Sequence, residues 1–464
     1  MLAFALPLQG SALPVERAST VSARELVNLT VYSGGTALVH DRRRVRLDEG
    51  LNRIAWRDVS EQIDATSALL DSPHAPGSLH VLEQNFDYDL LDPQALLRRY
   101  VGHTVTVVHD ARFAGDRETR EPAKILSING GIVLQYRDRI ETQVRGHIIF
   151  PASPANFRDK PTLVLDIASG SAGVQTLDLS YLTGGLSWSA DYVGVLSADE
   201  AHLALTGLVT LSNTSGTGYD GAHLQLVAGN VNIARPPTLP QMRTIASVQS
   251  DTYSVNVQQE NYFEYHLYTL ARPTTIADKQ TKQLSLLSAK GIPVKKTLEL
   301  RGSPSYQSEN ADLGDRIPVG VYVTFVNAGG DLGIPLPGGT VRLYKADSRG
   351  LTQFLGSDTI THTPKNEPVR LHLGDSFDVT ARKRQTAYEQ SGGCSSTSSY
   401  DIIISNAKDA AQDVLVVETI GGDWRIQSEN LKHRKSSATS ANWLVHAAPD
   451  ARATLSYSVR VKWC

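Results

Sequence analysis

The strongest constraint on the fold is an alternation of apolar and polar residues over 177–192, in the segment LDLSYLTGGLSWSADY. The apolar positions on the two sides of Gly184 and Gly185 are Leu177, Leu179, Tyr181, Leu186, Trp188, Ala190 and Tyr192. Alternation with a period of two puts these side chains on one face of an extended chain, and a Gly-Gly pair favours a turn. The segment therefore predicts a β-hairpin with one buried face.

The same pattern recurs along the chain, as in HLALTGLVTLSN at 202–213 and HLQLVAGNV at 223–231. It is clearest in TLSYSVRVKW at 454–463, which predicts a closing strand with Leu455, Tyr457, Val459, Val461 and Trp463 facing inward. We therefore predict an all-β fold class, with multi-domain antiparallel β-sandwiches, a small SH3-like barrel and one short helix.

Strand and turn signals divide the chain into five expected parts. They are a signal-peptide remnant or flexible tail at 1–24, an N-terminal β domain at 25–90, a short helix plus small β-barrel at 91–152, a central β-sandwich at 160–318 with a long inserted loop at 234–261, and a C-terminal β-sandwich at 319–464. Asp92 as cap, Pro93 in the first helical position and Gly102 as stop predict the helix.

Composition favours a globular protein without a nucleic-acid partner, and the first residues are compatible with export. The 464 residues include 45 Lys and Arg and 48 Asp and Glu, which gives a formal net charge of -3. The chain therefore has no overall positive charge that would attract nucleic acid. No apolar run reaches the roughly 18 residues of a transmembrane helix. The start, MLAFALPLQGSALP, has the apolar stretch and small residues of a signal peptide but lacks its positive region, so a disordered apolar tail is the alternative.

The two cysteines, Cys394 and Cys464, give a possible disulfide. Pairing would close a loop of roughly 70 residues and suit an oxidising compartment. The alternative is two free, exposed thiols, because Cys394 lies in a Gly/Ser-rich loop and Cys464 is the last residue.

No catalytic, cofactor or metal motif stands out. The segment 169–173 lacks the first glycine of a nucleophile elbow, and the Gly-Gly pairs lie between strands, where no helix can bind phosphate. A weak candidate His/carboxylate site is formed by His362, His372, Asp375 and Asp378, with a strand end and a turn as the alternative. We predict no cofactor.

Basic and aromatic clusters offer surfaces for contact. The basic runs at 41–46 and 382–384 could touch phosphate or a lipid headgroup, or could be solvated strand edges. Trp188, with its tyrosine neighbours, could stack on sugar or fill a core. Tyr253, Tyr262 and Tyr265 lie in or beside the irregular 234–261 loop, and they are the possible partner-binding residues.

Several sequence blocks resemble a known bacterial family. They are LSYLTGGLSWSADY, LVAGNVN, YFEYHLYTLARPTTIADKQTKQLSLL, GIPLPGGTVRLYKAD and, between 362 and 379, HTPK and LGDSFDV. In this order they resemble the domain of unknown function 4139 (DUF4139), found in mucoidy-inhibitor-like exported β proteins. The chain lacks the long coiled coil of those members. The resemblance implies a periplasmic or extracellular β protein and provides no catalytic residues.

Three functions follow as hypotheses. The first is an exported cell-envelope β scaffold, structural or protein-binding and without catalytic activity, which could associate with the envelope surface. The second is a self-assembling extracellular fibre or oligomer subunit that adds strands at sheet edges. The third is an envelope-directed hydrolase, for which His362, Asp375 and Asp378 are the only candidates.

Overall fold

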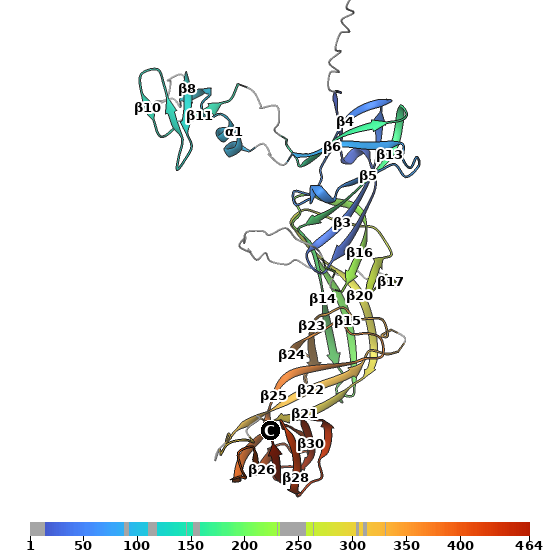
Figure 1. The fold of residues 1–464 in the computed structure, drawn as a ribbon, viewed down its shortest axis with the longest axis vertical. Helices are drawn as coiled ribbons and strands as arrows, with labels where there is room; N and C mark the ends of the chain where they lie inside the picture. The colour runs from blue at the N-terminus through green and yellow to red at the C-terminus, as the bar shows by residue number, and fades with distance from the viewer. Residues whose placement is uncertain are drawn as a thin grey trace, which may run out of the picture. The chain divides into compact units, whose positions relative to one another are not determined.

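The computed structural model describes residues 14–87, 92–109, 118–144, 146–151, 158–229, 231–232, 257–262, 264–302, 306–309, 313–329 and 331–464. The fold is all-β, as the alternation predicts, with several antiparallel-rich sheets and one α-helix among these residues (Figure 1). No helix in the described part of the chain is long and apolar enough to cross a membrane.

The chain forms two compact units. Unit 1 comprises Met1–Ser187, Ser212–Leu226 and Arg272–Thr281. Unit 2 comprises Trp188–Leu211, Val227–Ala271 and Lys282–Cys464.

Unit 1 contains a four-stranded sheet and a run of antiparallel strands around β3. The four-stranded sheet has the order β1 (Glu16–Ser19), β4 (Gly50–Arg57), β12 (Thr162–Ser169), β6 (Leu79–Asp87). The second run is β16 (Tyr219–Ala228), β2 (Arg24–Tyr32), β3 (Thr36–Leu47), β13 (Gly173–Gly184), β5 (Leu69–Asp71), with β19 (Thr274–Ile276) also on β16. Strands expected in separate domains, at 25–90 and 160–318, therefore share sheets.

Unit 1 also contains the helix and the five short strands expected at 91–152. The sheet order is β10 (Ile140–Glu141), β9 (Val133–Gln135), β8 (Thr119–Ser127), β7 (Thr104–His109), β11 (Gly146–Ile149). Helix α1 (Pro93–Arg99) is capped as predicted, because Ala95 N donates to Asp92 Oδ1 at 2.7 Å. Within the described residues the five strands pair in an open path with β10 and β11 at its ends.

Unit 2 contains a five-stranded and a nine-stranded sheet (Figure 1). The first has the order β20 (Gln280–Pro293), β15 (His202–Asn213), β14 (Leu186–Leu196), β23 (Gly339–Ala346), β24 (Thr352–Ile360). The second has the order β28 (Asp423–Glu429), β31 (Ala451–Lys462), β26 (Ser395–Asn406), β25 (Pro368–Gln390), β22 (Ile317–Val326), β21 (Lys295–Arg301), β27 (Gln412–Thr419), β30 (Ser440–Ala447), β29 (Arg434–Ser437). Strands β17 (Val257–Tyr262) and β18 (Tyr265–Leu270) form an antiparallel pair.

The closing strand β31 behaves as its alternation predicts. Leu455, Tyr457, Val459 and Val461 are buried, and Trp463 packs half-buried against the same core. The ring of Tyr457 stacks on that of Trp443 with 4.7 Å between centroids. Burial of these alternate side chains forms the core of the nine-stranded sheet.

The hairpin predicted at 177–192 is wrong, although both of its strands form. Strand β13 pairs with β3 and β5, whereas β14 belongs to the five-stranded sheet and pairs in parallel with β23. At Gly185, φ is 77°, and a Cβ would lie 2.8 Å from Ser215 Cα, so glycine is required where the chain leaves β13. The alternation of apolar and polar residues indicates which face of a strand is buried, but it does not indicate which strand pairs with it.

The interpretation of the two basic runs as strand edges is also wrong, although Arg44, Arg46, Arg382 and Arg384 within them are exposed to solvent. Strands β3 and β25, which carry them, lie inside their sheets. Arg43 is fully buried and donates to Asp41 at 2.6 Å, and Lys383 is buried against Glu418 at 2.7 Å. The partner that neutralises Lys383 is 35 residues away in sequence, so the run itself gives no sign of burial.

Candidate functional site: an aliphatic pocket beside an exposed phenylalanine

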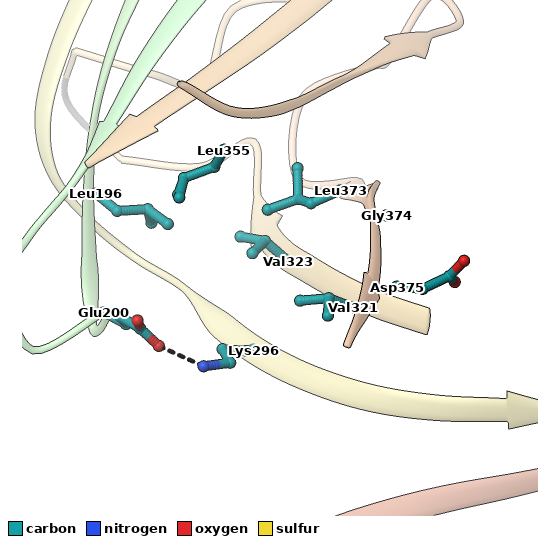
Figure 2. Close-up of a pocket in the computed structure, with 9 residues that line it drawn as sticks. All are labelled: Leu196, Glu200, Lys296, Val321, Val323, Leu355, Leu373, Gly374 and Asp375. Atoms are coloured by element: carbon teal, nitrogen blue, oxygen red, sulfur yellow. Dashed lines mark hydrogen bonds and ion pairs between the residues drawn. The ribbon is translucent and has the colours of Figure 1, made fainter. Parts of the chain in front are cut away.

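Unit 2 contains a pocket of about 230 Å³ between its two sheets. Strands β14 and β24 of the five-stranded sheet contribute Leu196 and Leu355. The nine-stranded sheet contributes Lys296, Val321, Val323, Leu373, Gly374 and Asp375, and the ninth lining residue, Glu200, lies between β14 and β15. Figure 2 shows the aliphatic side chains around one space, with Glu200 and Lys296 at one end.

Two β-bulges supply two of the three leucines of the pocket wall, Leu355 and Leu373. In the β23–β24 pair, Leu343 lies opposite Gly356 and Tyr344 opposite Phe354, which leaves Leu355 unmatched. In the β22–β25 pair, Val321 lies opposite Gly374 and Tyr322 opposite His372, so Leu373 is unmatched as well. A bulge redirects the side chain of its extra residue. The pocket therefore depends on strand register.

Strand β24 lies close to β25 at the pocket. A Cβ on Gly356 would lie 2.5 Å from the carbonyl oxygen of Leu373, so only glycine allows this approach. The side chain of Asp358 accepts a hydrogen bond from His372 N at 2.7 Å. These contacts hold Leu355 and Leu373 in the same wall.

The charged end of the pocket is an ion-pair triad. Glu200 lies 2.6 Å from Lys296 Nζ and 2.7 Å from Lys345 Nζ. The hydrogen bonds from Lys296 and then Lys345 lower the pKa of Glu200 to about 2, against the opposing effect of burial. One carboxylate with two ammonium groups gives this end a net charge of +1.

Of the weak candidate site, the structure brings together His372 and Asp375, whose side chains lie 3.9 Å apart. The ring of His372 stacks on Tyr322 with 4.8 Å between centroids. The carboxylate of Asp375 points away from the aliphatic side chains (Figure 2). Asp378 lies three residues further along β25.

His362 belongs to a different cluster, which is formed by residues from several of the sequence blocks that resemble DUF4139. Its Nδ1 accepts a hydrogen bond from Gly338 N at 3.0 Å. Tyr192 and Tyr268 donate to the carbonyl oxygens of Pro337 and Pro335, each at 2.8 Å. Burial, and then the charge of His266, lower the pKa of His362, so the neutral ring acts as an acceptor. The cluster holds the 333–338 loop in place.

Trp188, Tyr181 and Tyr192 are buried, so the sugar-stacking interpretation is wrong and the core interpretation is confirmed. Tyr265 packs over Gly229, where a Cβ would lie 2.7 Å from the ring. Tyr253 and the side chain of Tyr262 lie outside the described residues.

Sequence reasoning missed the pocket and the most exposed phenylalanine in the described chain, Phe377. The sequence did contain one signal for Phe377. It is an apolar residue that lies between acidic residues in GDSFDV, outside the alternation of apolar and polar residues that marks the buried face of a strand. Within the described residues, no group of three or more His, Cys, Asp or Glu side chains is arranged to hold a metal ion.

No protein-family model matches the chain, and no curated protein matches it either. The resemblance to DUF4139 therefore stays a prediction that rests on the sequence blocks.

Proposed function

We propose that this protein is an exported cell-envelope scaffold that binds a protein partner and catalyses no reaction. The observation that carries the proposal is the apolar surface at the pocket. Phe377, two residues after Asp375 of the pocket lining, is 94% exposed, and Leu355 of the aliphatic wall is 39% exposed. Monomeric soluble proteins rarely leave apolar side chains together in this way unless something binds them.

The disulfide supports export. Cys394 and Cys464 are bonded, with 5.6 Å between their Cα atoms. Structural disulfides persist in oxidising compartments such as the bacterial periplasm or the extracellular space, and are rare in the cytosol. The resemblance to DUF4139 points to the same compartments.

The chemistry of the pocket supports binding over catalysis. Its walls are aliphatic, and Glu200 stays ionised between two lysines at every pH above about 2. A general acid or base needs a pKa near the working pH. The pocket is suited to an apolar group.

A photo-crosslinking residue at position 377, in cells that express and export the full chain, tests the proposal. We expect discrete adducts of defined mass, because a bound partner covers this side chain. The matched control is position 444, since Leu444 is also an exposed apolar residue on a strand of unit 2. Equal, diffuse labelling at both positions would contradict the proposal.

A further inference from the structure

Phe377 lies in an irregular bulge within β25, which we name the Phe377 turn (375–378). Against β22, Thr380 lies opposite Pro318 and Asp375 opposite Gly320. The four residues 376–379 therefore face the single residue Val319, and the chain must bulge outward.

The turn is fixed at its base. Val379 is fully buried, and its N donates to Ser376 Oγ at 3.2 Å. The carbonyl oxygen of Asp378 accepts a hydrogen bond from Ala407 N at 2.9 Å. Because its base is held, the backbone of the turn does not have to be ordered when the exposed phenyl ring docks, which lowers the entropic cost of docking.

The pocket is large enough for this ring. An apolar protein cavity of about 150 Å³ binds benzene, and the pocket here is about 230 Å³ with five aliphatic side chains around it. Phe377 does not fill the pocket of its own chain, because it is 94% exposed.

The Phe377 turn and the Glu200 end of the pocket also carry charges of opposite sign. The Phe377 turn carries two exposed carboxylates, Asp375 and Asp378. The pocket has a carboxylate of its own, Asp375, on the side opposite Glu200 (Figure 2). The Glu200 end carries a net charge of +1, from Glu200 between Lys296 and Lys345. An acidic turn favours this basic end and is repelled by an anionic lipid surface, so a protein surface is the better partner.

We propose that a second copy of this chain is the partner. In a two-fold pair, each copy inserts Phe377 into the pocket of the other, and Asp375 and Asp378 face the lysines around Glu200. Because the turn and the pocket belong to the same unit, one symmetry operation creates both contacts and closes the assembly. This inference rests on the proposed function and names its partner.

Sedimentation equilibrium on the full chain provides the test. We expect a concentration-dependent dimer for the natural sequence and at least about tenfold weaker association for Phe377→Ser. Leu444→Ser, which removes an equally apolar exposed side chain elsewhere in unit 2, should associate like the natural chain. Unchanged melting temperatures confirm that the variants fold.

Mixing two defective variants gives a sharper result. Phe377→Ser lacks the inserted ring but keeps the pocket, whereas Leu355→Arg keeps the ring but blocks the pocket. Alone, each variant has no intact contact, and a mixed pair has one. We therefore expect mixed dimers in preference to either homodimer, a pattern that general loss of stability would not produce.

Three results would overturn the inference. They are a natural chain that is monomeric at all concentrations, a Phe377→Ser variant that dimerises normally, and Phe377-dependent binding to vesicles of phosphatidylglycerol. If the chain is monomeric but position 377 crosslinks to another envelope protein, the proposed function stands and the second copy is excluded. If neither occurs, both fail.

Discussion

At the scale of single residues, the most informative groups are charged side chains that the sequence pattern predicts to be exposed but that the structure buries. Lys383 and Glu418 are 3% and 0% exposed, and their charged groups lie 2.7 Å apart. Tyr306 donates its hydroxyl to the same carboxylate. A buried charge without its partner is costly, so this pair makes the C-terminal core sensitive to one-sided changes.

Lys383→Met should destabilise the protein by about 3–5 kcal/mol, because it leaves the carboxylate of Glu418 buried and unpaired. The double variant Lys383→Met/Glu418→Gln should recover much of this loss, since glutamine is neutral and still accepts from Tyr306. Urea unfolding measures both. Lys462→Met, at an exposed position on β31, is the control. A double variant no more stable than Lys383→Met would contradict the account.

Glu200 gives a pH prediction with a definite sign. Its pKa falls from 4.5 to about 2 on folding, so its contribution is fully present above pH 4.5 and is lost as pH falls through 2. Allowing for solvent screening, Glu200→Gln should cost about 1 kcal/mol at pH 7. The difference from the natural chain should shrink as urea titrations move from pH 4.5 towards 2. Glu389→Gln, at an exposed glutamate, should show no such trend.

At the scale of elements, the disulfide extends an existing ladder. Strands β26 and β31 pair from Ser395 opposite Lys462 to Asn406 opposite Ala451, and Cys394 and Cys464 continue beyond the first of these pairs. The bond also restricts the unfolded chain, because it closes a loop between residues 70 apart in sequence.

Reduction should therefore lower the free energy of unfolding by about 4 kcal/mol. Guanidinium unfolding with and without dithiothreitol measures this loss. The variant Cys394→Ala/Cys464→Ala should be insensitive to the reductant, and should match the reduced natural chain. An identical midpoint in both conditions for the natural chain would contradict this role.

Strand positions were predictable, and strand partners were not. Alternation depends on which side chains are buried, so it located β31 and the strands on both sides of Gly185. It could not reveal that β13 and β14 belong to different sheets, because every apolar face fits several partners equally well. The pocket was hidden for the same reason, since Leu355 and Leu373 line it only through the mismatch between two strand registers.

At the scale of the whole molecule, the two sheets of unit 2 together carry the apolar surface that we propose as a contact site. The nine-stranded sheet fixes the Phe377 turn and the five-stranded sheet completes the pocket, both within unit 2. The alternation of apolar and polar residues predicted the all-β class, and the disulfide was among the open alternatives, but this surface depends on tertiary structure. The account therefore depends on whether a protein covers Phe377.

The most direct measurement uses a purified full chain with a photo-crosslinking residue at position 377, mixed with an equal amount of nitrogen-15-labelled chain. Mass spectrometry of the adducts separates crosslinks between copies from crosslinks within one copy. The account predicts mixed-isotope adducts that join position 377 to the peptides carrying Leu196 or Leu355. Adducts that are absent between copies, or that map to surfaces away from the pocket, would contradict it.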